Sequence, residues 1–136
     1  MIIEYCSDVI ALYQNKLVLI ERLETIKGIA LPGGRRDLID GELEDVASCA
    51  IREFQEETGL TLIIGGELGT YDKPGRDPRG PKISDTVYGR AYGTIKDEPG
   101  KTKVFTIEPE GFHRYKGLFV FDHYDMVKDW YKECKK

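Results

Sequence analysis

The stretch Ala50–Leu60, which reads AIREFQEETGL, decides how the rest of this sequence is interpreted. It places three carboxylates and one arginine between apolar residues, and it ends in a glycine and a leucine. Over residues 44–58 the apolar positions recur with the i, i+3, i+4 spacing of an amphipathic helix, and Gly59 supplies a C-terminal stop. The pattern predicts a helix over 44–58 whose apolar face is formed by Val46, Ala47, Ala50, Ile51 and Phe54.

The acidic side of this helix indicates a function. Arg52, Glu53 and Glu56 fall opposite the apolar face, and Glu57 lies at its border. Most acidic helix faces are simply solvated, but they usually carry Lys at i+4 to relieve repulsion, and this one carries only Arg52. Crowded hard oxygen donors suit Mg²⁺ or Mn²⁺, which share the oxygens of a bound phosphate. The preceding LPGG (31–34) lets the backbone turn back towards the carboxylates, so the sequence predicts a metal–phosphate site.

Length and composition predict a single globular domain over residues 1–136. The net charge is −4, from 20 basic and 24 acidic residues, which argues against nucleic acid or a membrane surface as the main partner. No apolar run approaches the roughly 20 residues of a membrane span. The opening MIIEYCSDVI lacks the basic region of a signal peptide, and the three cysteines are widely spaced, as in reduced proteins. We therefore expect a cytoplasmic protein.

The rest of the chain reads as strands separated by turns. A second helix is expected over 122–134, with Asp122 available as its N-cap. Strands interrupted by two well-separated helices predict an α/β (α+β) fold in which a mixed β-sheet is sandwiched between α-helices. The expected strands are 5–13, 16–22, 28–31, 61–72, 84–95 and 103–108.

From Glu44 onward the chain resembles the Nudix hydrolases, whose motif is G-x5-E-x7-R-E-U-x-E-E-x-G-U, where U is a bulky apolar residue. Every fixed position from Glu44 to Leu60 agrees in register. The first glycine departs from the pattern, because position 38 is leucine and Gly34 lies four residues too early. Glu42 and Glu44 both stay open for the early glutamate. Glu44 is preferred, because a helix register is harder to shift than a loop length.

The resemblance implies hydrolysis of a nucleoside diphosphate linked to another group, with Mg²⁺ or Mn²⁺ as cofactor. It implies Glu56 and Glu57 as the main metal ligands, with Glu53 completing the site or orienting a water molecule. A backbone oxygen of Gly34 would add a ligand. Arg52 would hold one of the glutamates through a bidentate contact.

The catalytic base often lies on a later loop in this family. Glu98, in KDEPGK after a predicted strand, is the best-placed candidate. Glu108 and Glu110 are its rivals, and for these two an ordinary acidic turn is the stronger interpretation.

The stretch GTYDKPGRDPRG (69–80) resembles a loop of the small ADP-ribose pyrophosphatases within the family, as does FDH at 121–123. A plain polar hairpin loop is the alternative for 69–80. The resemblance implies that Arg76 and Arg79 contact phosphate or ribose, and that the product pair is AMP and ribose 5-phosphate. Other substrates left open are a modified nucleoside triphosphate or a coenzyme A-type molecule, and a non-catalytic ligand-binding protein is the third hypothesis. The resemblance also allows a homodimer. Further substrate contacts are expected from Arg22, Gly33 and Gly34.

Overall fold

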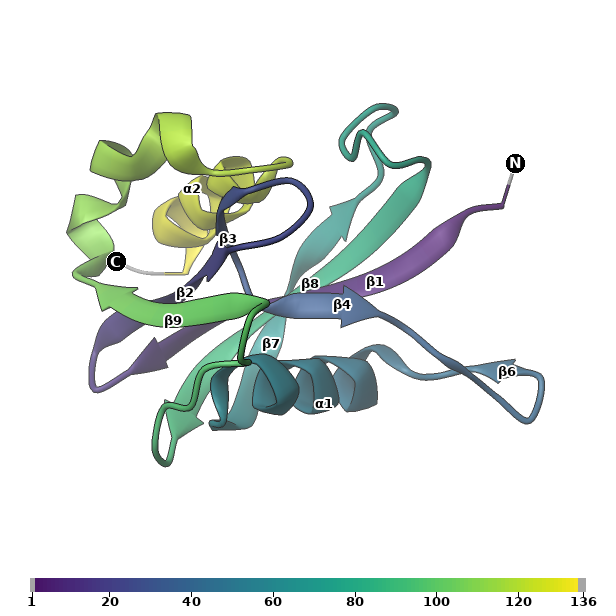
Figure 1. The fold of residues 1–136 in the computed structure, drawn as a ribbon, viewed down its shortest axis with the longest axis horizontal. Helices are drawn as coiled ribbons and strands as arrows, with labels where there is room; N and C mark the ends of the chain where they lie inside the picture. The colour runs from purple at the N-terminus through teal and green to yellow at the C-terminus, as the bar shows by residue number, and fades with distance from the viewer. Residues whose placement is uncertain (1, 135–136) are drawn as a thin grey trace.

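The computed structural model describes residues 2–134, in which a mixed β-sheet has helices on both faces (Figure 1). Within these residues the sheet has seven strands, with the central order β3–β2–β1–β8–β7, while β4 pairs with β1 and β9 with β2. β5 and β6 form a separate hairpin. The elements are β1 (Glu4–Tyr13), β2 (Lys16–Arg22), β3 (Gly28–Ala30), β4 (Gly33–Arg35), β5 (Leu38–Ile39), β6 (Glu42–Leu43), α1 (Val46–Thr58), β7 (Thr61–Tyr71), β8 (Lys82–Tyr92), β9 (Thr102–Ile107), the 3₁₀ segment η1 (Pro109–Leu118) and α2 (His123–Glu133).

The pairing of β1 opens a space in the sheet. β1 runs parallel to β8, but it pairs with β2 only beside the turn that joins them, at Leu12–Leu17 and Tyr13–Lys16. Further along, β4 takes the free edge of β1, while β2 pairs with β3 and β9. The N-terminal half of β1 and the C-terminal half of β2 therefore diverge.

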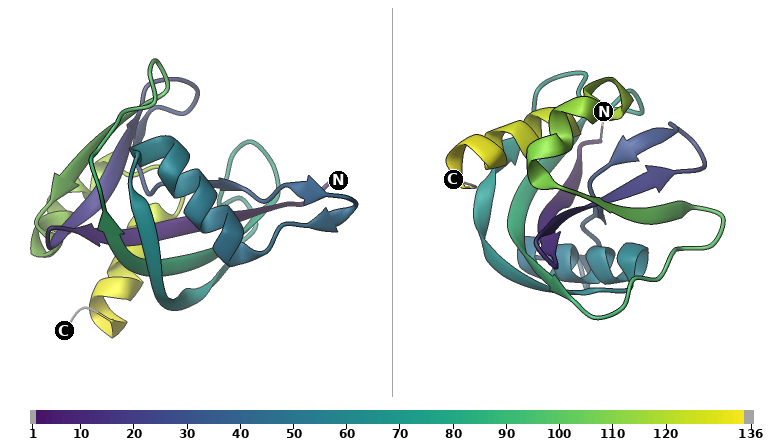
Figure 2. Two further views of the ribbon diagram at one scale, coloured as in Figure 1. Left: turned by 90° about the horizontal axis from the view of Figure 1, so that it is seen from below. Right: turned by 90° about the vertical axis from the view of Figure 1, so that its left-hand side faces the viewer.

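Alternating side chains of the central strands form two cores, one on each face of the sheet. Figure 2 shows the helices that cover these faces. α1 covers one face, where Ala50 and Phe54 are fully buried. η1 and α2 cover the other face, where Phe112 and Met126 are buried. Burial of a phenylalanine or methionine side chain stabilises the fold by about 1.5–3 kcal/mol. The predicted sandwich of a mixed sheet between helices is confirmed.

The first helix is confirmed but begins later than predicted, at Val46 instead of residue 44. The Asp45 carboxylate accepts a hydrogen bond from the Ser48 N–H (2.7 Å) and caps the helix. Gly59 ends it with a φ of 77°, a left-handed conformation that favours glycine.

The predicted apolar face of α1 was partly wrong. Ala47 and Ile51 are exposed, whereas Cys49 and Thr58 are buried. Periodicity defines an apolar arc, but packing decides which part of the arc is covered. Here α1 contacts β1, β4 and β7, and this orientation turns Cys49 and the glutamates at 53 and 57 towards β4.

Four features were not predicted. The strand β4 forms where the sequence analysis expected a turn. The four residues in excess of the motif belong to the segment that forms the β5–β6 hairpin, which projects from the body of the molecule. The segment 109–118 forms η1. Asp122 precedes α2 as expected, but its side chain makes no capping hydrogen bond and pairs with Arg76 instead.

Among residues 2–134 there is no helix of the length and apolarity that a bilayer crossing requires.

Candidate active site

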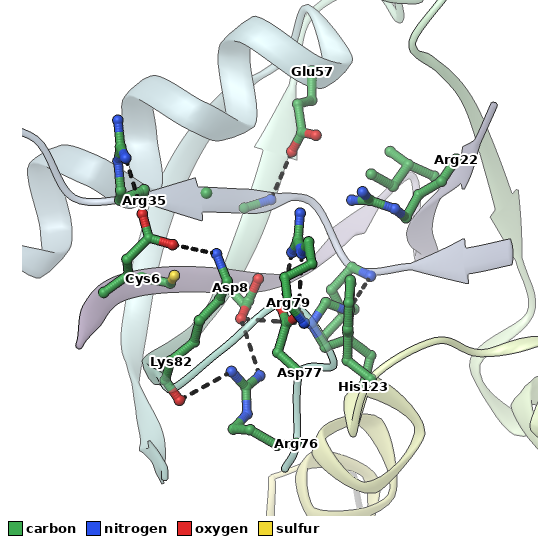
Figure 3. Close-up of a pocket in the computed structure, with 16 residues that line it drawn as sticks. Cys6, Asp8, Arg22, Arg35, Glu57, Arg76, Asp77, Arg79, Lys82 and His123 are labelled. Carbon is green, nitrogen blue, oxygen red and sulfur yellow. Dashed lines mark hydrogen bonds and ion pairs between the residues drawn. The ribbon is translucent and has the colours of Figure 1, made fainter. Parts of the chain in front are cut away.

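A cavity of about 360 Å³ lies where β1 and β2 diverge, a size that suits a small-molecule ligand (Figure 3). Its walls come from β1, β2, β4, the 76–82 segment and the start of α2. The C-terminal end of α1 contributes Glu57, which points down onto β4. The charged residues around the cavity are Glu4, Asp8, Arg22, Arg35, Glu57, Arg76, Asp77, Arg79 and Lys82.

Arg52 organises the glutamates beside this cavity. Its guanidinium donates to both carboxylate oxygens of Glu44, at 3.0 and 2.7 Å, and this bidentate pairing holds the pKa of Glu44 below its usual value. The same guanidinium contacts Glu53 at 2.9 Å and Glu56 at 3.3 Å. The structure therefore pairs Arg52 with Glu44, while Glu42 is exposed in the β5–β6 hairpin.

Two glycines of β4 allow the carboxylates of the motif at 44–60 to lie against this strand. The Gly33 N–H donates to Glu57 Oε1 at 2.7 Å. A side chain at Gly34 would collide with the carboxylate of Glu53, so only glycine permits this approach. Burial raises the pKa of Glu53, and burial raises the pKa of Glu57 to about 8. Glu56 differs from both because half of its side chain is exposed. Of these three glutamates, Glu57 lines the cavity, and Glu53 and Glu56 lie outside its lining.

This donor set fits a divalent cation. In the range 2–134, no three His, Cys, Asp or Glu side chains converge closely enough to form a fixed protein cage for a metal. Mg²⁺ does not require one, because it usually keeps several waters and binds one or two carboxylates plus phosphate oxygens. Burial is the main cause of the raised pKa of Glu57, and the neighbouring Glu53 charge raises it further. A cation would relieve the repulsion between the two carboxylates.

Across the cavity, two guanidinium groups flank one aromatic ring. The Arg22 and Arg79 carbons Cζ lie 5.3 and 5.1 Å from the centroid of the Phe121 ring. Phe121 has a φ of 57°, which an aromatic residue rarely adopts. Burial and the neighbouring Arg79 charge lower the pKa of Arg22, so the two cations destabilise each other. An anionic ligand between them would remove that cost.

The two arginines of the predicted binding loop lie in different environments. Arg79 is 41% exposed at its side chain and pairs with Asp77 at 2.8 Å. Arg76 is only 5% exposed and donates to both oxygens of Asp122, at 2.9 and 2.8 Å. The expectation that both arginines contact a ligand stays a prediction. In this structure the guanidinium of Arg76 joins the loop to Asp122, the residue before α2.

Only some of the predicted site residues line the cavity. Arg22, Gly33, Gly34, Glu57, Arg76 and Arg79 all line the cavity. Glu98 does not line it, but Glu98 pairs with Thr102, and Thr102 pairs with the cavity residue Arg22 across β9 and β2. Glu108 and Glu110 are exposed at the start of η1 and lie outside the cavity lining.

Several cavity residues were missed by the sequence analysis. Asp8 is 7% exposed and accepts a hydrogen bond from the Ser84 hydroxyl at 2.6 Å. Burial alone raises its pKa, but His123, Ser84 and Arg76 together hold the pKa below the usual value. A carboxylate inside the apolar run DVIAL was the available signal, because aspartate is disfavoured in strands. Nothing local marked Cys6, Arg35 or Lys82, whereas Asp77 lies within the 69–80 stretch but was not singled out there.

Comparison with known proteins places this geometry in context. The family model described as NUDIX domain matches residues 6–131. An ADP-ribose pyrophosphatase of Methanocaldococcus jannaschii is 34% identical over 123 residues, which are 85% of this chain and 66% of that protein. A bifunctional NMN adenylyltransferase/ADP ribose pyrophosphatase from Francisella tularensis, complexed with AMP and a Mn ion, superimposes with a TM-score of 0.82 at 23% identity, over 96% of this chain and 42% of that one. The NUDIX domain of Shewanella oneidensis NrtR complexed with ADP ribose gives 0.80 at 17% identity, over 97% and 88%.

Proposed function

This chain belongs to the NUDIX domain family, and on that premise we propose that it hydrolyses the diphosphate of ADP-ribose to AMP and ribose 5-phosphate. The similarity to the archaeal ADP-ribose pyrophosphatase supports this substrate. The chain spans 66% of the length of that relative and 42% of the Francisella chain, so the activity is argued from the site itself.

The observation that carries the proposal is the opposition of charges across the cavity. Glu57 lines the cavity from α1, and the guanidinium groups of Arg22 and Arg79, which also line it, each lie close to the Phe121 ring. A diphosphate has the negative charge that relieves the repulsion between the guanidinium groups. A ligand with planar and hydroxyl-bearing parts also suits an aromatic ring and forked N–H donors.

The protein's own groups would divide the work as follows. Arg22, Arg79 and Lys82 bind phosphate oxygens and hold the diphosphate in one orientation, which removes translational and rotational freedom before the reaction. Arg52 holds Glu44, Glu53 and Glu56 in place. Glu98 is the base that we propose for accepting a proton from the attacking water, since it pairs with Thr102, which lies beside the cavity residue Arg22 in the sheet.

Mg²⁺ or Mn²⁺ would be held by Glu57 and Glu53, with Glu56 and the carbonyl oxygen of Gly34 as further donors. When bound, such a cation neutralises phosphate charge and lowers the pKa of water. Both effects depend on electrostatic attraction, which is stronger where water is excluded. Glu53 and Glu57 have little access to solvent, so they suit this role.

A substrate panel tests the proposal. The purified protein is incubated with Mg²⁺ and either ADP-ribose, a nucleoside triphosphate or coenzyme A, and products are separated by anion-exchange chromatography. We expect AMP and ribose 5-phosphate from ADP-ribose at the highest kcat/KM. Rapid cleavage of the triphosphate or coenzyme A with none of ADP-ribose would reassign the substrate, and no turnover of any of them would indicate a ligand-binding protein.

A further inference from the structure

His123 is buried where α2 meets the cavity, with 4% of its surface exposed. Its Nδ1 atom accepts a hydrogen bond from the Leu31 N–H at 3.0 Å. A ring nitrogen that accepts cannot carry a proton, so the proton of the neutral imidazole is on Nε2. Nε2 faces the Asp8 carboxylate, whose Oδ2 lies 3.6 Å away. The surroundings of His123 therefore select one tautomer.

The Leu31 amide begins the short segment that carries the cavity glycines. Pro32 has no N–H to donate, and its carbonyl accepts from the Val9 N–H at 2.9 Å. The next amide, that of Gly33, donates to Glu57 at 2.7 Å. Three consecutive residues thus each make one hydrogen bond to a different element, namely α2, β1 and α1.

Asp8, on β1, is the third residue of this arrangement. It lies directly opposite Gly33 in the β1–β4 pairing, where any side chain at position 33 would collide with it. Its carboxylate is fixed by the Ser84 hydroxyl at 2.6 Å. The His123 ring is therefore held on one side by Asp8 and holds the Leu31 amide on the other.

We propose that His123, as the neutral Nε2–H tautomer, is a positioning residue that sets the backbone of residues 31–34 and, through the Gly33 amide, the carboxylate of Glu57. Its effect on turnover rests on the proposed function, whereas its effect on the backbone does not. The alternative is a core histidine whose only contribution is volume. The two differ in whether the position of the hydrogen-bonding atom matters.

Two amide substitutions separate these alternatives. His123→Asn places a carbonyl oxygen near the position of Nδ1 and can still accept from Leu31. His123→Gln places its amide near the position of Nε2 and leaves the Leu31 N–H without an acceptor. Both variants remove the ring and introduce the same chemical group. His113→Asn is the control, because His113 is the other histidine of the chain and is exposed on η1, where it contacts Tyr124.

The first measurement needs no substitution. Long-range ¹H–¹⁵N correlation of the histidine side chains in the wild-type protein should show His123 protonated at Nε2 and not at Nδ1. Amide hydrogen exchange is then compared among the variants. We expect exchange at Leu31 to be about tenfold or more faster in His123→Gln than in His123→Asn, because a buried donor has lost its acceptor. Exchange at Gly33 should follow in the same order, and His113→Asn should match the wild type.

Activity is the second readout. We expect kcat for ADP-ribose to be about tenfold lower in His123→Gln than in His123→Asn, with similar KM values. A proton on Nδ1, or equal exchange and equal kcat in the two variants, would overturn the proposal. If the wild-type protein does not cleave ADP-ribose, the proposed function fails, while the tautomer and the exchange rates still decide the role of His123.

Discussion

Replacing Arg76 with methionine should destabilise the fold far more than it weakens substrate binding. Methionine keeps much of the length and apolar volume of the arginine stem but removes the guanidinium. The two hydrogen bonds to Asp122, at 2.9 and 2.8 Å, are then lost, and Asp122 stays only 17% exposed without its partner. Asp8 also loses a cation 4.0 Å away.

The expected loss is about 3 kcal/mol in the free energy of unfolding, the lower end of the range for removing one partner of a buried ion pair, because Asp122 retains some contact with water. An unfolding entropy of about 2.1 cal/mol/K per residue over 136 residues converts this loss into a fall of about 10 °C in Tm. Urea titration followed by circular dichroism measures the free energy, and steady-state kinetics with ADP-ribose measure KM.

Asp122→Asn and the double variant complete a double-mutant cycle, and we expect the two single losses not to add, because both remove the same contact. Arg79→Met is the matched control, since its guanidinium lies on the same loop but is 41% exposed. The reasoning is refuted if Arg76→Met unfolds within about 0.5 kcal/mol of the wild type while KM rises tenfold, because Arg76 would then act on the ligand.

Three further outcomes follow from the site. Glu57→Gln should lower kcat by orders of magnitude while the circular dichroism spectrum and Tm stay near wild type. The amide oxygen can still accept a hydrogen bond from the Gly33 N–H, but the metal-binding charge is gone. Full activity would reject Glu57 as a metal ligand. Arg79→Ala should reduce kcat/KM for ADP-ribose about ten- to a hundredfold, the cost of one charge-assisted hydrogen bond. The reduction of kcat/KM for a nucleoside triphosphate should be smaller. Equal reductions for both substrates would mean that the loop contacts the shared diphosphate or serves folding. Arg52 lowers the pKa of Glu44 below its ordinary value of 4.5, so the stabilisation from this carboxylate is present above pH 4.5 and is lost as the pH falls through the lowered folded-state pKa. The gap in unfolding free energy between wild type and Glu44→Gln, measured by urea titration, should therefore narrow on going from pH 7 to pH 3, and a constant gap would contradict this reasoning.

The helix that carries the glutamate motif was predictable because its sequence signals are local. The i, i+3, i+4 spacing and the stop at Gly59 act within a few residues, and they located α1 to within two residues of its start. The spacing of Glu53 and Glu57, one turn apart, follows from helix geometry alone. Their orientation towards β4 does not, because the sequence also allowed a helix rotated towards Ile51, which the structure leaves exposed.

The 69–80 loop shows a limit of sequence interpretation. Arg76 and Arg79 lie three residues apart in similar surroundings along the chain. Only the folded structure distinguishes them, because Arg76 meets Asp122, which is 46 positions away in sequence, while Arg79 meets Asp77 beside it.

The sequence by itself determined six of the strands, the two helices and the carboxylate spacing of the glutamate motif, but not β4 or the β5–β6 hairpin. The predicted features depend on the backbone preferences of neighbouring residues and on the fixed period of each element. Tertiary structure decided which further side chains join the predicted residues around the cavity. Asp8 from β1, Phe121 and His123 from the segment that starts α2, and Leu31 before β4 are brought together by packing on both faces of the sheet. The hydrogen bond between Leu31 and His123 joins residues 92 positions apart, and no local pattern specifies such a contact.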